Sequence, residues 1–385
     1  MKIKHFFTGM LVICLFVGCK GNLTTDNSIE SSIEEYISKW DYIPGLSVSV
    51  YSPTLDLLFS YASGLSSIEE KTPNRKDTPH ITYSITKSFT ASSIIRLINE
   101  GKCSFDDSVS DFIDDLNSIY INNDATIAEL LSHRSGIYDY TDNAKLFYNN
   151  PFKNENIWNP TKILDYIETP ACERGTFVYS STNYILLGMI VEKITGNKLN
   201  KYLKENFFDN IPVFGLKLYP EDEIDMSLVA HPHAYPNTFA GLVGDGKTPI
   251  DIQSVISDVL MLSGKCSWAA GGVVGTTDEI AKWGYELLSE NGKFYLTEGK
   301  KIVESVNNFI DSTKETECYG YGVRKIIYNE IEFIGSYGRS IGDENLMFYN
   351  KDKDVIIVIF SSSNMREDKT PNIDELMYSI YDSIN

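Results

Sequence analysis

The feature that most constrains the fold is the placement of strands at both ends of the chain, with helices between them. Residues 45–51 contain the alternating run LSVSV, and residues 57–61 follow as a second strand after a turn at Ser52-Pro53. Four further strand-like runs lie near the C-terminus, at 319–328, 331–336, 345–350 and 354–361. The pattern predicts an α/β (α+β) fold, with one antiparallel sheet built from both chain ends and flanked by helices. A mostly helical lobe is expected as an insertion at about 102–245.

The first 18 residues have the organisation of an export signal. Two lysines precede an apolar run from Phe6 to Val17. This run is shorter than the roughly 20 residues that a membrane-spanning helix needs. It ends in the letters FVGC, which resemble the bacterial lipobox, so Cys19 is the expected lipidation site and residues 19–28 the expected tether. The sequence predicts an exported lipoprotein facing the periplasm or the cell exterior; a plain secretory signal with an incidental cysteine is the alternative.

Charge and cysteine usage exclude several classes of protein. The net charge of −19, without a basic stripe, argues against nucleic acid as a partner. The cysteines beyond the signal and Cys19 lack CxxC spacing, which argues against a zinc knuckle; they are Cys103, Cys172, Cys266 and Cys318. Disulfides and buried free thiols both stay open for them. We expect a monomer with no metal and no organic cofactor.

Ser84 and Lys87 form the first candidate catalytic pair. They lie three residues apart at the start of an expected helix, marked by an apolar stripe from Phe89 to Ile98 and a stop at Gly101. This spacing puts both side chains on one face. A serine hydroxyl can then pass its proton to a lysine amine that desolvation keeps neutral, and the helix N-terminus favours the developing oxyanion. Alone the signal is weak, because about one or two SxxK matches arise by chance in a chain of this length.

Tyr179 is the second candidate, in the segment Tyr179-Ser180-Ser181. A phenol oxygen near the Ser–Lys pair can act as the acid–base group for the attacking hydroxyl and the leaving group. The alternative is that Tyr179, one of 24 tyrosines, only packs its ring in the core.

Five segments together resemble the family of class C β-lactamases, D-alanyl-D-alanine carboxypeptidases and related serine esterases. They occur in the family's order and span about residues 80–345. They are YSITKSFTA from Tyr83, TIAELLSHRSGI from Thr126, GTFVYSSTNYILLG from Gly175, AAGGVVGTTDEIAKW from Ala269, and YGYGV from Tyr319 followed by GRSIG from Gly338. The joint match is far more specific than any single motif. It implies a β-lactamase/transpeptidase-like domain over residues 29–385.

The resemblance also implies the role of each matching residue. Ser84 would be the acylated nucleophile, and Lys87 and Tyr179 would handle its proton. The oxyanion hole would be the backbone N–H of Ser84 and that of Arg339, which follows the strand glycine Gly338. His133 matches a structural helix-to-loop turn, so we expect it to pack or hydrogen-bond and not to serve in a triad.

Two departures from the family fall in the substrate-binding positions. Ser181 stands where the family has an asparagine amide for the substrate carbonyl. Ser336-Tyr337-Gly338 stands where the family has lysine or histidine, then threonine or serine, then glycine. The missing cation weakens recognition of a substrate carboxylate, although Arg339 or Arg324 could supply one from a neighbouring position. These departures predict poor β-lactam hydrolysis and favour an ester or an unusual peptide.

Two other motifs lack the context that their functions require. Residues 241–248 match the phosphate-loop pattern GxxxxGK[ST], but Pro249 follows at once and no buried strand precedes, so a flexible loop is expected. His231 and His233 have no third metal ligand at a suitable spacing, so we expect a loop with two exposed histidines.

Two functional hypotheses follow. The first is a serine hydrolase that forms an acyl intermediate on Ser84 and acts on a small-molecule or cell-wall substrate, either a peptide, a β-lactam or an ester. The second is a binding or sensor lipoprotein, resembling the penicillin-binding proteins, that acylates slowly or not at all. Ser181 and Ser336 motivate the second, because both departures affect recognition and proton relay.

Overall fold

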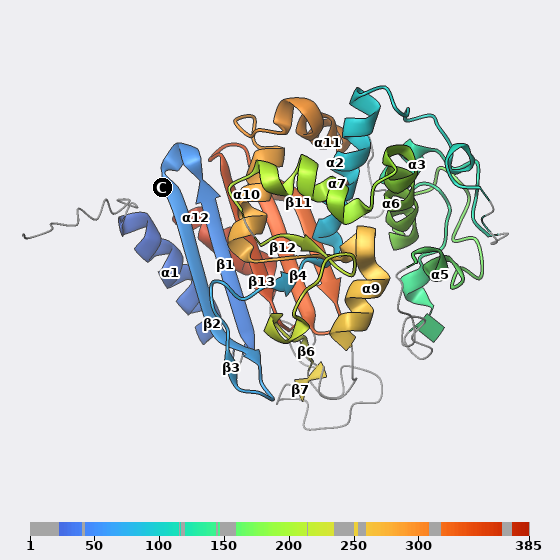
Figure 1. The fold of residues 1–385 in the computed structure, drawn as a ribbon. Helices are drawn as coiled ribbons and strands as arrows, with labels where there is room; N and C mark the ends of the chain where they lie inside the picture. Colours follow the sequence, from blue (N-terminus) through green and yellow to red (C-terminus); the bar gives the residue numbers. More distant parts are fainter. Residues whose placement is uncertain are drawn as a thin grey trace, which may run out of the picture.

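An antiparallel sheet of eight strands forms the centre of the molecule (Figure 1). The computed structural model describes residues 23–40, 43–114, 116, 120–143, 145–146, 159–213, 215–234, 250–252, 259–307, 317–363 and 372–384. The strand order is β3-β2-β1-β13-β12-β11-β10-β9. The strands are β1 (Gly45–Ser52), β2 (Leu57–Ser67), β3 (Thr72–Pro73), β9 (Glu317–Tyr319), β10 (Arg324–Tyr328), β11 (Ile331–Ser340), β12 (Asp343–Asn350) and β13 (Val355–Ser361). The predicted fold class is confirmed, because N-terminal β1 pairs with C-terminal β13.

The alternation in β1 matches the two faces of the sheet. Val48 and Val50 are buried in the apolar cluster formed with α1 (Leu23–Ser38) and α12 (Ile373–Ser383). Ser49 points to the opposite face, where its hydroxyl donates to Thr277 Oγ1 at 2.8 Å in α10 (Thr277–Leu288). Successive residues of a strand point to opposite faces, so one face of β1 is apolar and the other polar. Helices therefore cover the sheet on both sides (Figure 1).

Helix α1 begins earlier than the sequence predicts. It starts at Leu23, within residues 19–28, and the expected tether stays a prediction. In this stretch Thr25 is buried and Ser28 Oγ donates to Thr24 O at 2.9 Å. The expected signal and Cys19 lie outside the described residues. None of the helices in the described part of the chain combines the length and hydropathy needed to cross a bilayer.

Helix α10 lies against the other face of the sheet, and further helices pack against it and beside the sheet (Figure 1). These helices are α2 (Thr86–Asn99), α3 (Ile127–Leu131), α5 (Thr161–Leu164), α6 (Ser181–Thr195), α7 (Leu199–Asn206), α9 (Val259–Gly271), α10 and α11 (Lys300–Ser305). On α2, Phe89 stacks on Trp283 of α10 with ring centroids 4.0 Å apart. On α6, a Cβ at Gly188 would lie 2.5 Å from Ala269 Cβ, so glycine permits the close approach of α6 and α9. One continuous core joins the expected inserted lobe to α2 and α9, and the boundaries of that lobe stay a prediction.

The described residues also form two small sheets and contain four free cysteines. Strands β4 (His80–Ile81), β8 (Val273–Gly275) and β5 (Lys217–Leu218) form one small sheet, and β6 (His233–Ala234) pairs with β7 (Ile250–Asp251). The four cysteines whose pairing the sequence left open are all free, two of them buried; they are Cys103, Cys172, Cys266 and Cys318.

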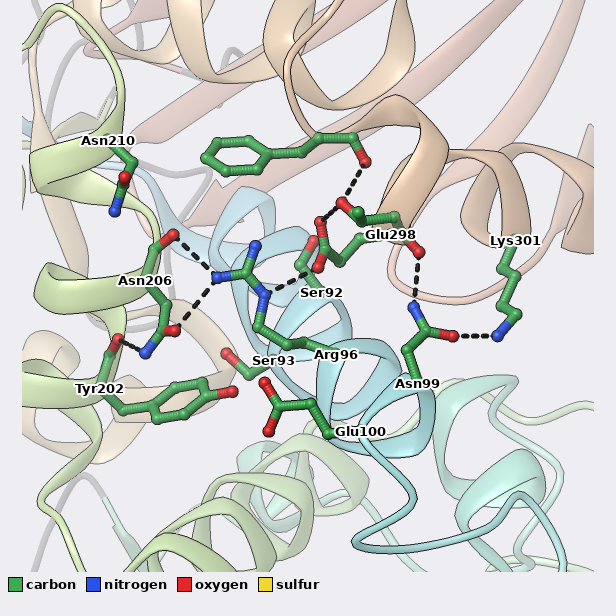
Figure 2. A network of polar contacts seen from close by, with 12 residues as sticks. Ser92, Ser93, Arg96, Asn99, Glu100, Tyr202, Asn206, Asn210, Glu298 and Lys301 are labelled. Carbon is green, nitrogen blue, oxygen red and sulfur yellow. Dashed lines mark hydrogen bonds and ion pairs between the residues drawn. The ribbon is translucent and has the colours of Figure 1, made fainter.

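A buried ion pair fixes the C-terminal end of α2 (Figure 2). Arg96 Nε donates to Glu298 Oε1 at 2.7 Å, and the Glu298 side chain is only 1% exposed. Arg96 Nη1 also donates to the backbone O and to Oδ1 of Asn206, each at 3.1 Å. The guanidinium lies 4.5 Å from the centroid of the Phe207 ring. One side chain of α2 thus joins the end of α7 to the turn that precedes α11.

Replacing Glu298 by alanine is expected to destabilise the fold by about 3–5 kcal/mol, because it leaves a buried charge without its partner. Urea unfolding followed by circular dichroism measures this as a lower midpoint at unchanged slope. The matched control is Glu290→Ala, which removes an exposed partner of Lys351 at the similar distance of 2.6 Å. That change should cost below about 1 kcal/mol. Equal losses in the two variants would contradict the expectation.

Candidate active site

Ser84 lies in a 3₁₀ turn (Tyr83–Ile85) that leads directly into α2. Its side chain is partly exposed, whereas the residues on either side, Tyr83 and Ile85, are buried. Tyr83 has a φ of +47°, which is unusual for a residue with a side chain. The turn therefore presents the Ser84 hydroxyl to solvent and anchors its neighbours in the core.

Lys87 is buried beside the Ser84 hydroxyl. Its side chain is 1% exposed, and Nζ lies 3.0 Å from Ser84 Oγ. The same amine donates to the backbone O of Ala270 at 2.9 Å and to Ser181 Oγ at 3.4 Å. Three partners from three segments thus hold the amine in place. The predicted one-turn spacing on α2 brings the Ser84 and Lys87 side chains together.

Tyr179 completes the group, and its hydroxyl donates to Ser84 Oγ at 2.8 Å. The Tyr179 ring packs on the ring of His133, with centroids 4.2 Å apart. His133 Nδ1 accepts the Ser180 N–H at 3.1 Å, and burial holds the pKa of His133 well below its usual range. A neutral, buried imidazole at this point orients Tyr179. This is the packing and hydrogen-bonding role that we expected of His133.

Two glycines allow other segments to approach the nucleophile. A Cβ at Gly322, where φ is +75°, would lie 2.7 Å from the backbone O of Lys87. A Cβ at Gly338 would lie 2.1 Å from the backbone O of Thr82. Both distances are below any real Cβ contact, so only glycine fits. The motifs YGYGV and GRSIG therefore pack directly on the turn and helix that carry Ser84.

The residues predicted for substrate binding divide between the two faces of β11. Ser336 Oγ lies 3.4 Å from the backbone O of Ser84, so Ser336 and Gly338 both face the nucleophile turn. Tyr337, which was predicted to bind substrate, does not face the site. Its hydroxyl donates to Asp374 Oδ1 of α12 at 2.7 Å, on the other face of the sheet. The alternation of side chains along a strand explains the difference. Ser181, at the start of α6, does lie at the site through its contact with Lys87.

The two arginines that could replace the missing cation lie in different surroundings. Arg339 Nη2 forms an ion pair with Glu344 Oε1 at 2.6 Å, with the arginine side chain more than half exposed. Arg324 begins β10, and its Cζ lies 5.6 Å from the ring centroid of Tyr319 and 5.2 Å from that of Tyr337. The Tyr319 ring in turn lies 5.7 Å from that of Tyr179. Arg324 is thus linked to the site through a single aromatic ring.

Residues 33–379 match the family described as Beta-lactamase. The chain belongs to the beta-lactamase family. It is 28% identical over 190 residues to protein flp of Staphylococcus aureus, which covers 48% of this chain and 37% of that protein. It is 28% identical over 182 residues to penicillin-binding protein 4* of Bacillus subtilis, covering 43% and 37%. The matched region therefore spans little more than a third of either relative. The family that the five motifs predict is confirmed.

Solved structures of the beta-lactamase family's fold superimpose over nearly the whole chain. The D-amino acid amidase of Ochrobactrum anthropi SV3, complexed with L-phenylalanine, has a TM-score of 0.76 at 19% identity. The alignment covers 93% of this chain and 98% of the amidase. The penicillin-binding protein of Bacillus halodurans has a TM-score of 0.69 at 20% identity, covering 92% and 98%. These likenesses show the fold.

The expectation for the two histidines, His231 and His233, is also wrong. His231 and His233 are buried, whereas we expected them to be exposed in a loop. His231 Nδ1 lies 2.7 Å from Asp251 Oδ2, which raises the pKa of His231. The backbone N–H of Ile68 donates to His233 Nε2 at 3.3 Å. The pairing of β6 with β7 brings Asp251 to the histidines. The phosphate-loop match at 241–248 lies outside the described residues.

Sequence reasoning missed two groups at the site. The backbone O of Ala270 accepts from Lys87, but a main-chain carbonyl leaves no signal in the residue type. Asp343 accepts from the hydroxyl of Tyr83 at 2.8 Å, across 260 positions of sequence. The one indication in the sequence was an acidic residue directly after GRSIG, and no local pattern showed that it would be buried. No group of three or more potential metal ligands occurs among the described residues.

Proposed function

We propose that this chain is a serine hydrolase that forms an acyl-enzyme intermediate on Ser84. One observation supports this above the others. The partly exposed Ser84 hydroxyl lies within hydrogen-bond distance of both a buried amine, Lys87 Nζ at 3.0 Å, and a phenol, Tyr179 OH at 2.8 Å. Such a group can activate a hydroxyl for attack and return a proton to the leaving group.

The contacts of Lys87 support one path for the proton. A neutral amine has two N–H groups and one lone pair. When the N–H groups are used by Ala270 O and Ser181 Oγ, the lone pair faces the hydroxyl of Ser84. As Ser84 Oγ bonds to the acyl carbon, its proton passes to the amine. Tyr179 gives its proton to the leaving nitrogen or oxygen and regains one from Lys87. Water then releases the acyl group by the reverse path.

The oxyanion is proposed to bind the backbone N–H of Ser84 and that of Arg339. The contact of Gly338 with the backbone of Thr82 supports this, since it brings the strand that carries Arg339 against the nucleophile turn. Both donors are backbone N–H groups, so the proposed oxyanion hole does not depend on the contacts of the Arg339 side chain.

An amide or ester substrate, related to peptides of the cell envelope, fits this site better than a β-lactam. Ser181 lacks the amide that would hold the substrate carbonyl, and Ser336 lacks a positive charge. The likeness to a D-amino acid amidase and to penicillin-binding proteins supports an amide or peptide. We propose Arg324 as the residue that attracts an anionic group of that substrate, because its charge helps to lower the pKa of His133 and its Cζ lies 5.6 Å from the Tyr319 ring.

Replacing Arg324 by alanine is expected to raise the KM for a peptide with a free carboxylate by about 10- to 100-fold, the effect of one charge-assisted hydrogen bond. The same peptide with an amidated C-terminus should lose little, so the ratio of the two KM values is the measurement. Arg339→Ala is the matched control, because that guanidinium pairs with Glu344. An unchanged ratio in Arg324→Ala would assign carboxylate recognition elsewhere.

Labelling with a fluorophosphonate, followed by peptide mass mapping, tests the proposed function. A single adduct on the peptide that contains Ser84 is expected. Rates with a p-nitrophenyl ester, a D-alanyl-D-alanine peptide, a D-amino acid amide and a chromogenic cephalosporin then rank the substrates. An adduct on another residue, or none, would overturn the proposal. A fluorescent penicillin adduct on Ser84 that never leaves, together with no turnover of any of the four substrates, would favour the slowly acylating sensor.

We further propose that the protein is exported and held to a membrane by lipid on Cys19, facing the periplasm or the cell exterior. The lysines and the apolar run that precede Cys19 support this. Intact-mass measurement of protein extracted from membranes tests the idea. We expect loss of the first 18 residues and the added mass of a diacylglyceryl group on Cys19. A mature chain without that added mass would favour the alternative, a plain secretory signal with no lipid on Cys19.

A further inference from the structure

The turn that carries Ser84 is tied to the β11–β12 hairpin by a bond outside the Ser84–Lys87–Tyr179 group. Tyr83, the residue before the nucleophile, is 4% exposed, and its hydroxyl donates to Asp343 Oδ2 at 2.8 Å. Asp343 is the first residue of β12 and is 5% exposed. The bond therefore joins two buried side chains from opposite ends of the sequence.

The backbone of Tyr83 is in a conformation that needs such support. Its φ of +47° lies in the left-handed region, where a residue with a Cβ is disfavoured by about 1–2 kcal/mol. Strained residues of this kind persist only where the surroundings hold them, and they concentrate at functional sites. The Tyr83 ring packs with Ile81, Tyr219 and Val274, and its hydroxyl reaches Asp343. Both ends of the side chain are thus fixed.

The β11–β12 hairpin contacts the residues just before the nucleophile turn at two further points. Asn345 Nδ2 donates to the backbone O of Ile81 at 3.0 Å, and Gly338 lies against the backbone of Thr82. Asp343 is paired across the hairpin with Ser340, the residue after Arg339. The Tyr83–Asp343 bond therefore spans the gap between the two chain segments whose N–H groups would form the oxyanion hole.

Stability alone does not account for a carboxyl group at this place. Burial raises the pKa of Asp343 to about 7, although the hydrogen bond from Tyr83 acts in the opposite direction. A buried carboxyl group is costly unless its hydrogen bonds are made, and an apolar pair of the same shape would avoid that cost. The pair is better explained by what it positions.

We propose that Tyr83 and Asp343 are positioning residues, whose hydrogen bond holds the strained turn so that the Ser84 hydroxyl and the two oxyanion N–H groups keep their separation. This inference rests on the proposed function of Ser84. It assigns the bond to the rate of acylation, with little effect on how much protein folds. Displacement of a reacting group by about 1 Å can cost about 100-fold in rate, so the effect should be large.

The test compares second-order rates of fluorophosphonate labelling. Tyr83→Phe removes one oxygen and keeps the ring, and we expect labelling about 10- to 100-fold slower, still reaching one label per chain. Asp343→Ala should also slow labelling, and the double variant should be no slower than Tyr83→Phe, because the phenol oxygen that bonds Asp343 is absent from both. Asp343→Asn keeps an acceptor oxygen and should recover most of the rate.

Tyr285→Phe is the matched control. Its hydroxyl donates to Asp354 Oδ2 at 2.7 Å, so the variant removes the same kind of bond in a different group of side chains, beside Tyr51 and Tyr349. We expect a labelling rate within twofold of the wild type, with melting temperature recorded for every variant. Tyr83→Phe labelling at the wild-type rate would overturn the inference and leave the proposed function intact. Rates that merely follow melting temperature across all variants would also overturn it. Absence of any label on Ser84 in the wild type would instead reject the proposed function.

Discussion

Replacing Ser84 by alanine is expected to lower the hydrolysis rate by about 10⁴-fold or more and to abolish covalent labelling. Ser84 Oγ lies 3.0 Å from Lys87 Nζ and 2.8 Å from the Tyr179 hydroxyl oxygen. Without Ser84 Oγ no acyl bond forms, and the remaining groups can only bind substrate. Steady-state rates with the preferred ester or amide, and labelling followed on a gel, measure the loss.

The control for that variant is Ser92→Ala, in α2 and about two helical turns further along the chain. Its hydroxyl only donates to the backbone O of Ser88 at 2.7 Å, within the helix. We expect its rate to remain within about twofold of the wild type, as for a buried change outside the site. Retention of a tenth of the wild-type activity in Ser84→Ala would show that another nucleophile carries the reaction.

Local spacing made part of the site predictable from sequence. Ser84 and Lys87 are one turn apart on a helix, so their proximity follows from helix geometry alone. Tyr179 is 95 positions from Ser84, and no local pattern could bring the two together. Only the joint resemblance of five segments placed it there. The sheet was predictable for a similar reason, because the alternation in β1 and the continuous apolar run of β13 are each visible within one strand.

The errors have equally particular causes. Tyr337 was included through its motif, although strand alternation puts it opposite Ser336, on the α12 face. His231 was expected to be exposed because Asp251, its buried partner, is 20 positions away in the sequence. Strand geometry thus decided the side of Tyr337, and a tertiary contact decided the burial of His231.

Replacing Lys87 by methionine is expected to slow labelling of Ser84 by about 10³-fold, within the range for loss of a general base. Methionine nearly fills the same volume, so the fold should survive. Removing a buried amine relieves its desolvation, while Ala270 O and Ser181 Oγ each lose a donor, which costs about 1 kcal/mol or more apiece. We therefore expect a urea midpoint close to that of the wild type. The labelling rate should therefore fall in this variant while its stability stays close to that of the wild type.

Chemical rescue distinguishes a base from a structural amine at this position. Lys87→Gly leaves space beside the hydroxyl, and added ethylamine should restore labelling in proportion to its concentration and to its neutral fraction as pH rises. Tetramethylammonium, which carries charge but no lone pair, is the control and should restore nothing. If ethylamine fails while Lys87→Met labels at the wild-type rate, the proton of Ser84 must leave through Tyr179. Tyr179→Phe would then be the variant that loses acylation.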